Sequence, residues 1–376
     1  MQNTEVAHLS SVHPRLDPRI FVKECRSLSA AGFQVYLVVA DGKGDDEQDG
    51  VRICDVGRVS GRLRRILITS RRVLKRALEL DAQLYHLHDP ELLTIAGPLL
   101  RAGKTVIFDA HEDVPVQIRG KPHLHPWIRP LLSRLYQAYE LRVTRQLGAV
   151  VTATPFIRDK FLSVNPNSVD VNNFPIPDEL VSLDTRPDVN LHQVCYVGAI
   201  SVSRGIREVV KAMNLVNSDT RLILCGKFEV ERVHREVETF DGWRRVDARG
   251  WLGREAIKDV LTQCVAGLVT LHPQQNYVDA HPVKMFEYMS AGLPVICSNF
   301  PLWRSIVEGS DCGVCVDPEQ PAEIAEAIDF LVQNPARAAE MGQNGRKAIE
   351  QKYNWPAEER KLIELYTRLT DCAQDL

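Results

Sequence analysis

Residues 276–299 read NYVDAHPVKMFEYMSAGLPVICSN and carry the clearest functional pattern in the chain. The pattern predicts a loop and then a short helix, which ends at Gly292 and is followed by a strand. Asp279 on the loop and Glu287 inside the helix are eight positions apart, so both can reach one ligand at the start of this helix, where free backbone N–H groups favour a phosphate. Lys284 lies in the first turn, where the helix dipole disfavours a cation. The presence of a lysine at this position is therefore better explained by an anionic ligand than by the stability of the helix.

Short apolar runs alternate with helical patterns on both sides of this segment. Several of the runs are continuously apolar, as parallel strands covered on both faces are. The alternation predicts a doubly wound α/β sheet that occurs twice in the chain. We expect strands at residues 5–9, 34–39, 51–54, 83–87, 105–108 and 149–153 in the first half, and at 194–197, 221–225, 265–271, 294–297 and 313–316 in the second.

A stretch with the composition of a linker separates the two halves. Residues 172–193 read NNFPIPDELVSLDTRPDVNLHQ, are rich in Pro, Asp and Asn, and show no sustained period. We place the boundary near residue 185, so that the domains cover 1–184 and 185–355. The last segment, 356–376, has helical spacing, and we expect a C-terminal helix that packs back on the first domain.

The composition excludes several classes of protein. The 376 residues are 44% hydrophobic and 25% charged, and with a net charge of −3 neither half is basic enough to indicate a nucleic-acid-binding groove. Every apolar run is shorter than the roughly 18 residues of a membrane-spanning helix, and the first residues lack the pattern of a signal peptide. Nine cysteines with scattered spacing indicate reduced thiols. We therefore expect a cytoplasmic α/β protein.

The segment 276–299 resembles the retaining GT-B-fold glycosyltransferases of family four, the glycosyl transferases group 1. Their hallmark is two acidic residues with seven between them, followed by a small residue, Gly and Pro-Val. Here these are Asp279, Glu287 and the run AGLPV at 291–295. The resemblance implies a GT-B architecture, with two Rossmann-like doubly wound domains facing each other across a cleft. It also implies that Glu287 binds the ribose of a nucleotide-sugar and that Asp279 contacts the donor sugar.

A second element of the family binds the donor diphosphate through two cations. The matching run is YVGAISVSRGI at 196–206, where Gly198 and Gly205 stand at the expected places and Arg204 replaces a lysine. Ala199 occupies the position of the other cation. Our hypothesis is that Lys284 supplies the missing charge.

The resemblance extends into the first half of the chain. The first strand is followed by SSVHPRLDPR at 10–19 in place of the family's glycine pair. Because bulky residues keep the backbone from approaching a diphosphate closely, we expect the Arg19 side chain to bind the donor instead. The run VIFDAHEDVP at 106–115 resembles the segment that delivers a histidine to the donor sugar, here His111, and Glu112 is expected on the acceptor side.

The run His86-Leu87-His88-Asp89 allows two interpretations. A His-x-His pair at a strand end is typical of metallohydrolases, and alternation puts both imidazoles on one face of the strand. The sequence offers no evident set of further ligands downstream, and the resemblance implies an enzyme without a bound metal or other cofactor. We therefore expect no metal site. We place His88 and Asp89 on the acceptor side, with N-capping by Asp89 as the alternative.

Residues 61–80, GRLRRILITSRRVLKRALEL, hold seven basic residues before the first acidic one. The apolar spacing predicts an amphipathic helix. Its apolar stripe either packs on the sheet or holds the basic face against anionic lipid. Trp127, with Arg129 and Arg134 nearby, is a second candidate for membrane contact.

Taken together, the residues and the resemblance predict a retaining hexosyltransferase that moves a sugar from a nucleotide-diphosphate-sugar to a hydroxyl acceptor. The resemblance suggests surface-polysaccharide or lipid-linked glycan assembly, with a glycan or lipid-linked acceptor and peripheral contact with the inner face of an anionic membrane. Two alternatives stay open: a sugar-nucleotide epimerase of GT-B fold, and a protein that binds nucleotide-sugar without turning it over. The sequence does not specify the base, the sugar, the acceptor or the oligomeric state.

Overall fold

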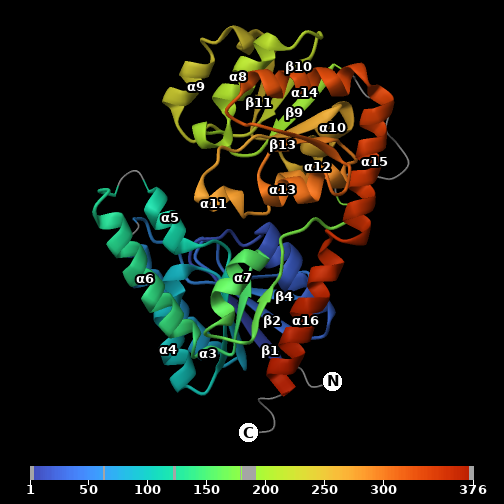
Figure 1. The fold of residues 1–376 in the computed structure, drawn as a ribbon. Coiled ribbons are helices and arrows are strands. Elements are labelled where there is room, and N and C mark those ends of the chain that lie inside the picture. Colours follow the sequence, from blue (N-terminus) through green and yellow to red (C-terminus); the bar gives the residue numbers. More distant parts are fainter. Residues whose placement is uncertain (1–3, 62–63, 122–123, 178, 180–191, 372–376) are drawn as a thin grey trace. The chain divides into compact units, whose positions relative to one another are not determined.

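Two mainly parallel β-sheets form the cores of two units of the chain (Figure 1). The computed structural model describes residues 4–61, 64–121, 124–177, 179 and 192–371. The first unit comprises residues 1–173 and 356–376, and the second comprises residues 174–355. The boundary that the sequence predicts near residue 185 lies outside the described residues.

The sheet of the first unit runs in the order β3-β4-β2-β1-β5-β6-β7-β8 over the described residues. Neighbouring strands are parallel except β3 and β4, which are antiparallel. The strand order reverses between β1 and β5, so the loops after these two strands diverge and leave room for functional side chains at that edge. The strands are β1 (Glu5–Leu9), β2 (Gln34–Val39), β3 (Asp46–Gln48), β4 (Val51–Asp55), β5 (Leu84–Leu87), β6 (Thr105–Ala110), β7 (Ala149–Thr152) and β8 (Ser168–Asp170).

Two α-helices of the first unit, α5 and α7, begin with a side-chain cap. Asp113 accepts a hydrogen bond from the Val116 N–H at the start of α5, and Thr154 accepts one from the Ile157 N–H at the start of α7. The helical segments are η1 (Pro18–Cys25) and η2 (Arg65–Thr69), which wind as π-helices, the 3-10 helix η3 (Pro90–Leu92), and α1 (Arg26–Ala30), α3 (Ser70–Leu80), α4 (Leu93–Arg101), α5 (Val114–Gly120), α6 (Ile128–Thr144) and α7 (Pro155–Leu162).

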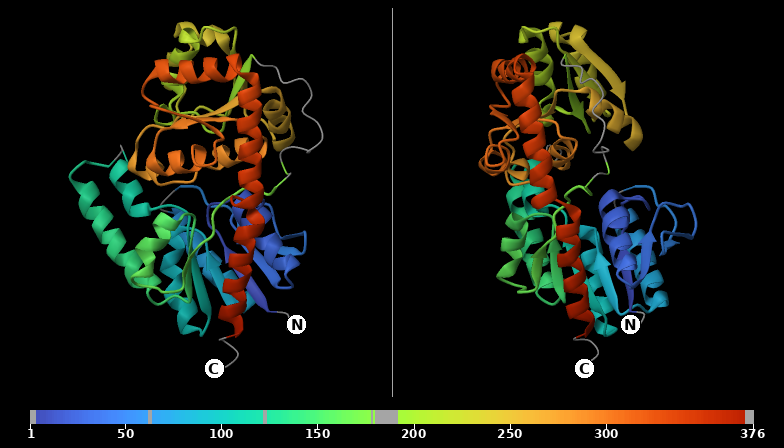
Figure 2. Two further views of the ribbon diagram at one scale, coloured as in Figure 1. Left: turned by 45° about the vertical axis from the view of Figure 1, so that its right-hand side comes forward. Right: turned by 90° about the vertical axis from the view of Figure 1, so that its right-hand side faces the viewer.

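The last helix, α16 (Trp355–Asp371), returns to the first unit and lies beside its sheet (Figure 2). Glu358 accepts hydrogen bonds from the backbone and side-chain N–H groups of Asn172. Further along the helix, the buried Tyr366 hydroxyl is 2.8 Å from His86 Nδ1. These contacts tie the end of the chain to strands near its beginning.

The sheet of the second unit is parallel throughout its described strands, in the order β11-β10-β9-β12-β13-β14. This is the doubly wound order in which the switch point lies between the first and fourth strands, here β9 and β12. Ligands bind such sheets beyond the carboxyl ends of the strands at that point. The strands are β9 (Gln193–Val197), β10 (Arg221–Cys225), β11 (Val246–Gly250), β12 (Ala266–Val269), β13 (Val295–Ser298) and β14 (Gly313–Val316).

Two apolar clusters hold the helices of the second unit against its sheet. One of them buries Trp303, Phe286 and Tyr288 almost completely. The helical segments are η4 (Val202–Arg204) and η5 (Asp241–Arg245), both 3-10 helices, and α8 (Ile206–Leu215), α9 (Glu231–Val237), α10 (Arg254–Gln263), α11 (Gln275–Val278), α12 (Val283–Ser290), α13 (Pro301–Val307), α14 (Pro321–Gln333) and α15 (Pro335–Gln351).

The prediction of a doubly wound α/β sheet that occurs twice is confirmed. Every strand that the sequence predicted is present, with ends that differ by a few residues at most. The sequence missed β3, β8 and β11, whose residues include many polar side chains. No helix among the described residues is long and apolar enough to cross a membrane.

Candidate functional site

The second unit presents a tightly turned loop at the carboxyl end of β9. Gly198 follows the strand with a φ of +121°, and Gly205 precedes α8 with a φ of +78°. A Cβ atom built on Gly205 would lie 2.0 Å from the Thr270 carbonyl oxygen, so glycine is required where this loop approaches the end of β12. The loop therefore lies at the switch point of the sheet, where ligands of this fold class bind.

Lys284, in the first turn of α12, points its ammonium group at this loop. The side chain is 8% exposed, and Nζ lies 3.7 Å from the centroid of the Tyr196 ring. A Cβ atom on Gly198 would be 3.9 Å from Nζ, which places the ammonium against the glycine. None of the described residues forms a hydrogen bond with Nζ. Burial, followed by the positive charge of Arg204, lowers the pKa of Lys284 to about 7.

Arg204 contributes the second cation of the loop. Its Nε atom lies 3.8 Å from Glu229 Oε1, and no hydrogen bond to Nε is found within the described ranges. Its guanidinium carbon lies 6.0 Å from the centroid of the Tyr277 ring. Two cations with few direct partners repel each other unless an anion lies near both. The geometry at Gly198 is therefore suited to a phosphate or diphosphate.

Glu287 lies one turn further along α12, and its Oε1 accepts a hydrogen bond of 3.0 Å from Arg254 Nη1. Arg254, at the start of α10, also donates two hydrogen bonds of 2.7 and 2.8 Å to the Glu179 carboxylate. Arg254 therefore fixes the direction of the Glu287 carboxylate. Because Arg254 lies 33 residues before Glu287 in the chain, the spacing of the motif did not predict this pairing.

Asp279 is partly buried in the loop between α11 and α12. The next residue, Ala280, accepts a hydrogen bond of 2.8 Å from the Trp303 indole N–H. Since Trp303 is fully buried, this bond anchors the loop to the core. The structure thus places Asp279 on a fixed loop directly before the helix that carries Lys284 and Glu287.

In the first unit, His111 follows β6 and is held by a buried carboxylate. Its Nε2 atom is 3.0 Å from Asp109 Oδ2 and 3.3 Å from His88 Nδ1. Although burial opposes ionisation, the charge of Arg19, followed by that of His111, holds the pKa of Asp109 well below its usual value. The sequence motifs did not indicate Asp109, although it lies on β6 only two positions before the histidine.

Arg19, which the sequence led us to expect at the donor, lies instead in the interior of the first unit. It lies in η1, is 4% exposed, and donates hydrogen bonds of 3.0 and 3.1 Å to Asp109 and one of 2.8 Å to the Val171 carbonyl. Its Nε atom is also 3.0 Å from Glu24 Oε1. This burial contradicts the expected role of Arg19 in binding the donor, because the guanidinium is already engaged by two carboxylates.

His88 and Asp89, which the sequence placed on the acceptor side, are also buried. Asp89 accepts hydrogen bonds from the Ser10 hydroxyl (2.9 Å) and the Ser11 N–H (2.6 Å). It shows no side-chain capping bond to the helical turn that follows it. Asp89 therefore holds the loop after β1, and of the three expected acceptor-side residues only Glu112 is exposed.

The His-x-His pair has the neighbours that the sequence did not reveal. His8 of β1 and Glu24 of η1 join His86 and His88 in a group whose potential ligand atoms all lie within 4.8 Å of one another. These residues are distant in sequence, and the sheet brings them together by placing β1 next to β5. Both of these neighbours precede the pair in the chain, whereas the sequence was judged only to lack an evident set of ligands downstream of it.

The first unit also exposes an apolar face on α6. The set consists of Trp127, Ile128, Leu131, Leu132, Leu135 and Tyr139, with Trp127 86% exposed. Arg134, Arg142 and Arg145 are exposed on or directly after the same helix. In the basic stretch 61–80, Ala77 is buried as the packing interpretation requires, while Leu67 and Leu78 are exposed. Residues 62–63 of that stretch lie outside the described residues.

Two family models match the chain in succession. The model described as "Glycosyltransferase Family 4" matches residues 19–172, and the model described as "Glycosyl transferases group 1" matches residues 184–348. Alpha-maltose-1-phosphate synthase from Mycolicibacterium smegmatis is 24% identical over 274 residues, which cover 66% of this chain and 70% of that protein.

Solved structures show the same fold over nearly the whole chain. Sucrose-phosphate synthase from Thermosynechococcus elongatus superposes with a TM-score of 0.76 at 19% identity, covering 98% of this chain and 100% of that one. HepE from Anabaena, solved in complex with UDP-glucose, gives a TM-score of 0.74 at 12% identity, covering 97% and 99%. The similarity at this level of identity concerns the fold.

Proposed function

Since the chain belongs to the GT-B glycosyltransferases that these two family models describe, we propose that its second unit binds a nucleotide-diphosphate-sugar and that the sugar passes to a hydroxyl acceptor with retention. In this reaction the bond between the anomeric carbon and the phosphate oxygen breaks, and the acceptor oxygen bonds to the same carbon on the same face. The negative charge that develops on the leaving diphosphate must be stabilised for the bond to break.

The buried ammonium of Lys284 is the observation that carries this proposal. It lies against Gly198 and is not hydrogen-bonded to any of the described residues. A buried cation without a partner is costly, so a site of this kind is maintained for a ligand of opposite charge. A diphosphate at Gly198 would contact Lys284, would lie within reach of Arg204, and would face the N-terminal turn of α12.

The remaining site residues act on the other parts of the donor. Glu287, directed by Arg254, is proposed to accept hydrogen bonds from the ribose hydroxyls. Asp279, on its anchored loop, is proposed to contact the donor sugar. His111 is proposed to contact the transferred sugar, with Asp109 fixing the direction of its ring. Chemistry of this kind requires no metal ion at the diphosphate, because the fixed cations supply the charge.

We propose further that the α6 face of the first unit contacts an anionic membrane, where a lipid-linked glycan acceptor would be found. The apolar positions 128, 131, 132, 135 and 139 repeat at helical spacing, as in helices that lie in the membrane interface. The adjacent exposed arginines suit anionic headgroups, at about 1 kcal/mol for each charge near the surface. A role in surface-polysaccharide or lipid-linked glycan assembly follows from such an acceptor.

Thermal denaturation with UDP, GDP and ADP, and with their sugars, tests the donor proposal. A ligand that binds only the folded state raises the melting temperature, by the equivalent of about 2.7 kcal/mol at a hundred times its Kd. We expect one nucleotide to stabilise the wild type and to stabilise the Lys284→Met variant much less. Equal stabilisation of both proteins by that nucleotide would contradict the assignment of Lys284.

Turnover assays distinguish the transferase from its two alternatives. We expect nucleotide release that depends on added acceptor, and a product whose anomeric configuration, measured by NMR, matches that of the donor. An epimerised nucleotide-sugar formed without acceptor would identify an epimerase. Binding without turnover across crude lipid acceptors would identify a binding protein.

Co-sedimentation with vesicles tests the membrane proposal. We expect the protein to pellet with phosphatidylglycerol-containing vesicles at low salt and to stay in solution with phosphatidylcholine alone. The double variant Leu131→Ser and Leu135→Ser should abolish pelleting, whereas the control Leu215→Ser changes a similarly exposed leucine of the second unit and should not. Wild-type protein that remains in the supernatant with anionic vesicles would exclude this membrane contact.

A further inference from the structure

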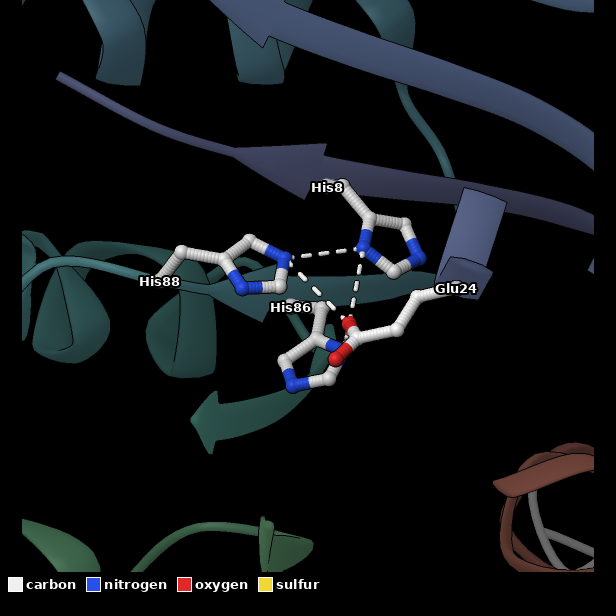
Figure 3. Close-up of side chains that lie close together, drawn as sticks. All are labelled: His8, Glu24, His86 and His88. Carbon is white, nitrogen blue, oxygen red and sulfur yellow. Dashed lines mark hydrogen bonds and ion pairs between the residues drawn. The ribbon is translucent and has the colours of Figure 1, made fainter. Parts of the chain in front are cut away.

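Three histidines and one glutamate meet in the interior of the first unit (Figure 3). His8 on β1 and His86 on β5 are direct partners across neighbouring parallel strands. His88 lies two positions after His86, so its side chain projects to the same face of the sheet. Glu24 reaches the three imidazoles from η1, and all four side chains are at most 1% exposed. The register of the sheet thus brings four potential ligands together in a site that is closed to solvent.

Within this group His8 Nδ1 and His88 Nε2 are at hydrogen-bond distance, whereas the Glu24 carboxylate lies too far from all three imidazoles for ordinary hydrogen bonds. Glu24 Oε2 lies 3.8 Å from His8 Nδ1 and 3.9 Å from both His86 Nδ1 and His88 Nε2. These separations are too long for hydrogen bonds. No donor among the described residues bonds to Oε2, although Oε1 is ion-paired with Arg19. A buried carboxylate oxygen that faces three imidazole nitrogens without a bond requires an explanation.

A small cation between these atoms provides that explanation. In a tetrahedral site, bonds of about 2.0–2.2 Å from one ion to nitrogen and oxygen ligands place the ligand atoms about 3.3–3.6 Å apart. The separations of 3.8 and 3.9 Å from Glu24 Oε2 are a few tenths of an ångström longer and would shorten on ion binding. His8 Nδ1 and His88 Nε2 are closer, at 2.8 Å, and would move apart by a few tenths of an ångström.

The surroundings of the group also resemble those of a metal centre. Histidine ligands commonly donate their other ring N–H to a carboxylate or another polar oxygen, which fixes the ring. Here His88 Nδ1 is 3.4 Å from Asp109 Oδ2, and His8 Nε2 is 3.1 Å from the Tyr366 hydroxyl. The same hydroxyl lies 2.8 Å from His86 Nδ1, a contact that ion binding at this nitrogen would replace.

We propose that His8, His86, His88 and Glu24 bind one divalent transition-metal ion, of which zinc fits this ligand set, as a structural centre of the first unit. Three imidazoles and one carboxylate complete a four-coordinate site, and a complete protein ligand set is typical of structural zinc. The ion would join β1, β5 and η1, and through Tyr366 it would also connect α16 to the sheet. The proposal is independent of the donor site, since Lys284, Arg204 and Glu287 belong to the other unit.

The metal content of the intact, tag-free chain tests this proposal directly. After purification with added zinc and exhaustive dialysis, we expect about one zinc ion per chain by mass spectrometry. Removal by a chelator should lower the melting temperature, and zinc should restore it, because the ion binds the folded state. Exchange with cobalt(II) should give the visible absorption of a four-coordinate nitrogen and oxygen site. A wild type without bound zinc, and without stabilisation by added zinc, would show that a water molecule or a proton occupies the site instead.

Matched variants locate the ion. Glu24→Gln and His86→Gln preserve side-chain size and should each lose the bound zinc. His234→Gln alters a partly exposed histidine of the second unit and should retain it. His111→Gln should also retain it, because His111 belongs to a separate group with Asp109 and the other nitrogen of His88. Retention of a full zinc complement by folded Glu24→Gln, or its loss from folded His111→Gln, would overturn the proposed ligand set. If Glu24→Gln does not fold, the cobalt(II) spectrum of the wild type tests the ligand set, and a spectrum without the absorption of a four-coordinate nitrogen and oxygen site would overturn it.

Discussion

Replacing Lys284 with methionine is expected to stabilise the free protein and to weaken donor binding. Methionine has a similar length and fills the same space over the Tyr196 ring without a charge. The fall in the pKa of Lys284 from 10.5 to about 7 corresponds to the free-energy cost of keeping this lysine protonated in the folded protein. At about 1.4 kcal/mol for each tenfold change in acidity, that cost is at most about 5 kcal/mol. This cost is reduced when the structure relaxes and water reaches the ammonium. We therefore expect methionine to raise the free energy of unfolding by about 2 kcal/mol.

The sign of the pH dependence follows from the same lowered pKa. Between about pH 7 and 10.5, the unfolded chain holds a proton on this lysine that the folded protein has released, so wild-type stability rises with pH across this window. Below pH 7 the folded and the unfolded chain both carry the proton, and the buried charge destabilises the folded protein to its full extent. The stabilising effect of methionine should therefore be largest at and below pH 7 and should disappear as the pH approaches 10.5.

Denaturant unfolding at several pH values, paired with donor kinetics, measures both effects. The KM for the donor should rise roughly tenfold to a hundredfold, as expected for the loss of a charge-assisted hydrogen bond to phosphate. Lys347→Met, which removes an exposed lysine of α15, serves as the control and should change neither quantity. A Lys284→Met protein that is less stable than the wild type at pH 7, or one with an unchanged KM, would refute the reasoning.

Three further changes test other parts of the structure. Glu287→Gln should raise the donor KM about tenfold with little change in stability, because the ribose contact loses its charge, and steady-state kinetics checks this. Asp109→Asn should destabilise the protein by about 3 kcal/mol in denaturant unfolding, because buried Arg19 loses a paired carboxylate; a change below 0.5 kcal/mol would show that the pair is unimportant. Gly205→Ala should lower both the melting temperature and donor affinity, because its Cβ would collide with the Thr270 carbonyl and the residue has a positive φ; an unaltered melting temperature would contradict the tight packing.

The site of the second unit was predictable because its residues lie close together in sequence. Asp279, Lys284 and Glu287 are placed by one loop and one helix, and their spacing alone brings them to the same helix end. The position of Lys284 against Gly198 depends on the sheet, yet both residues were identified from local motifs. Arg254 was not assigned a role, since only the folded chain brings α10 to Glu287.

The site of the first unit was harder to predict because strand pairing assembles it. His8 and His86 are far apart in the chain and become neighbours only when β1 pairs with β5. Arg19 was misplaced because the bulky residues of its loop suggested that a side chain replaces the backbone at the diphosphate, whereas η1 buries the guanidinium against Asp109. The strands missed by the sequence analysis were also those with weak apolar patterns; β3, for example, is fully exposed.

The return of α16 to the first unit has a consequence for synthesis of the protein. Tyr366 bonds to His86 and His8, which the ribosome produces about 280 and 360 residues earlier. Strands β1 to β8 therefore emerge, and the whole second unit is made, before the helix that covers this histidine group becomes accessible. Until α16 has been synthesised, the nascent first unit therefore retains an uncovered surface over its histidine group.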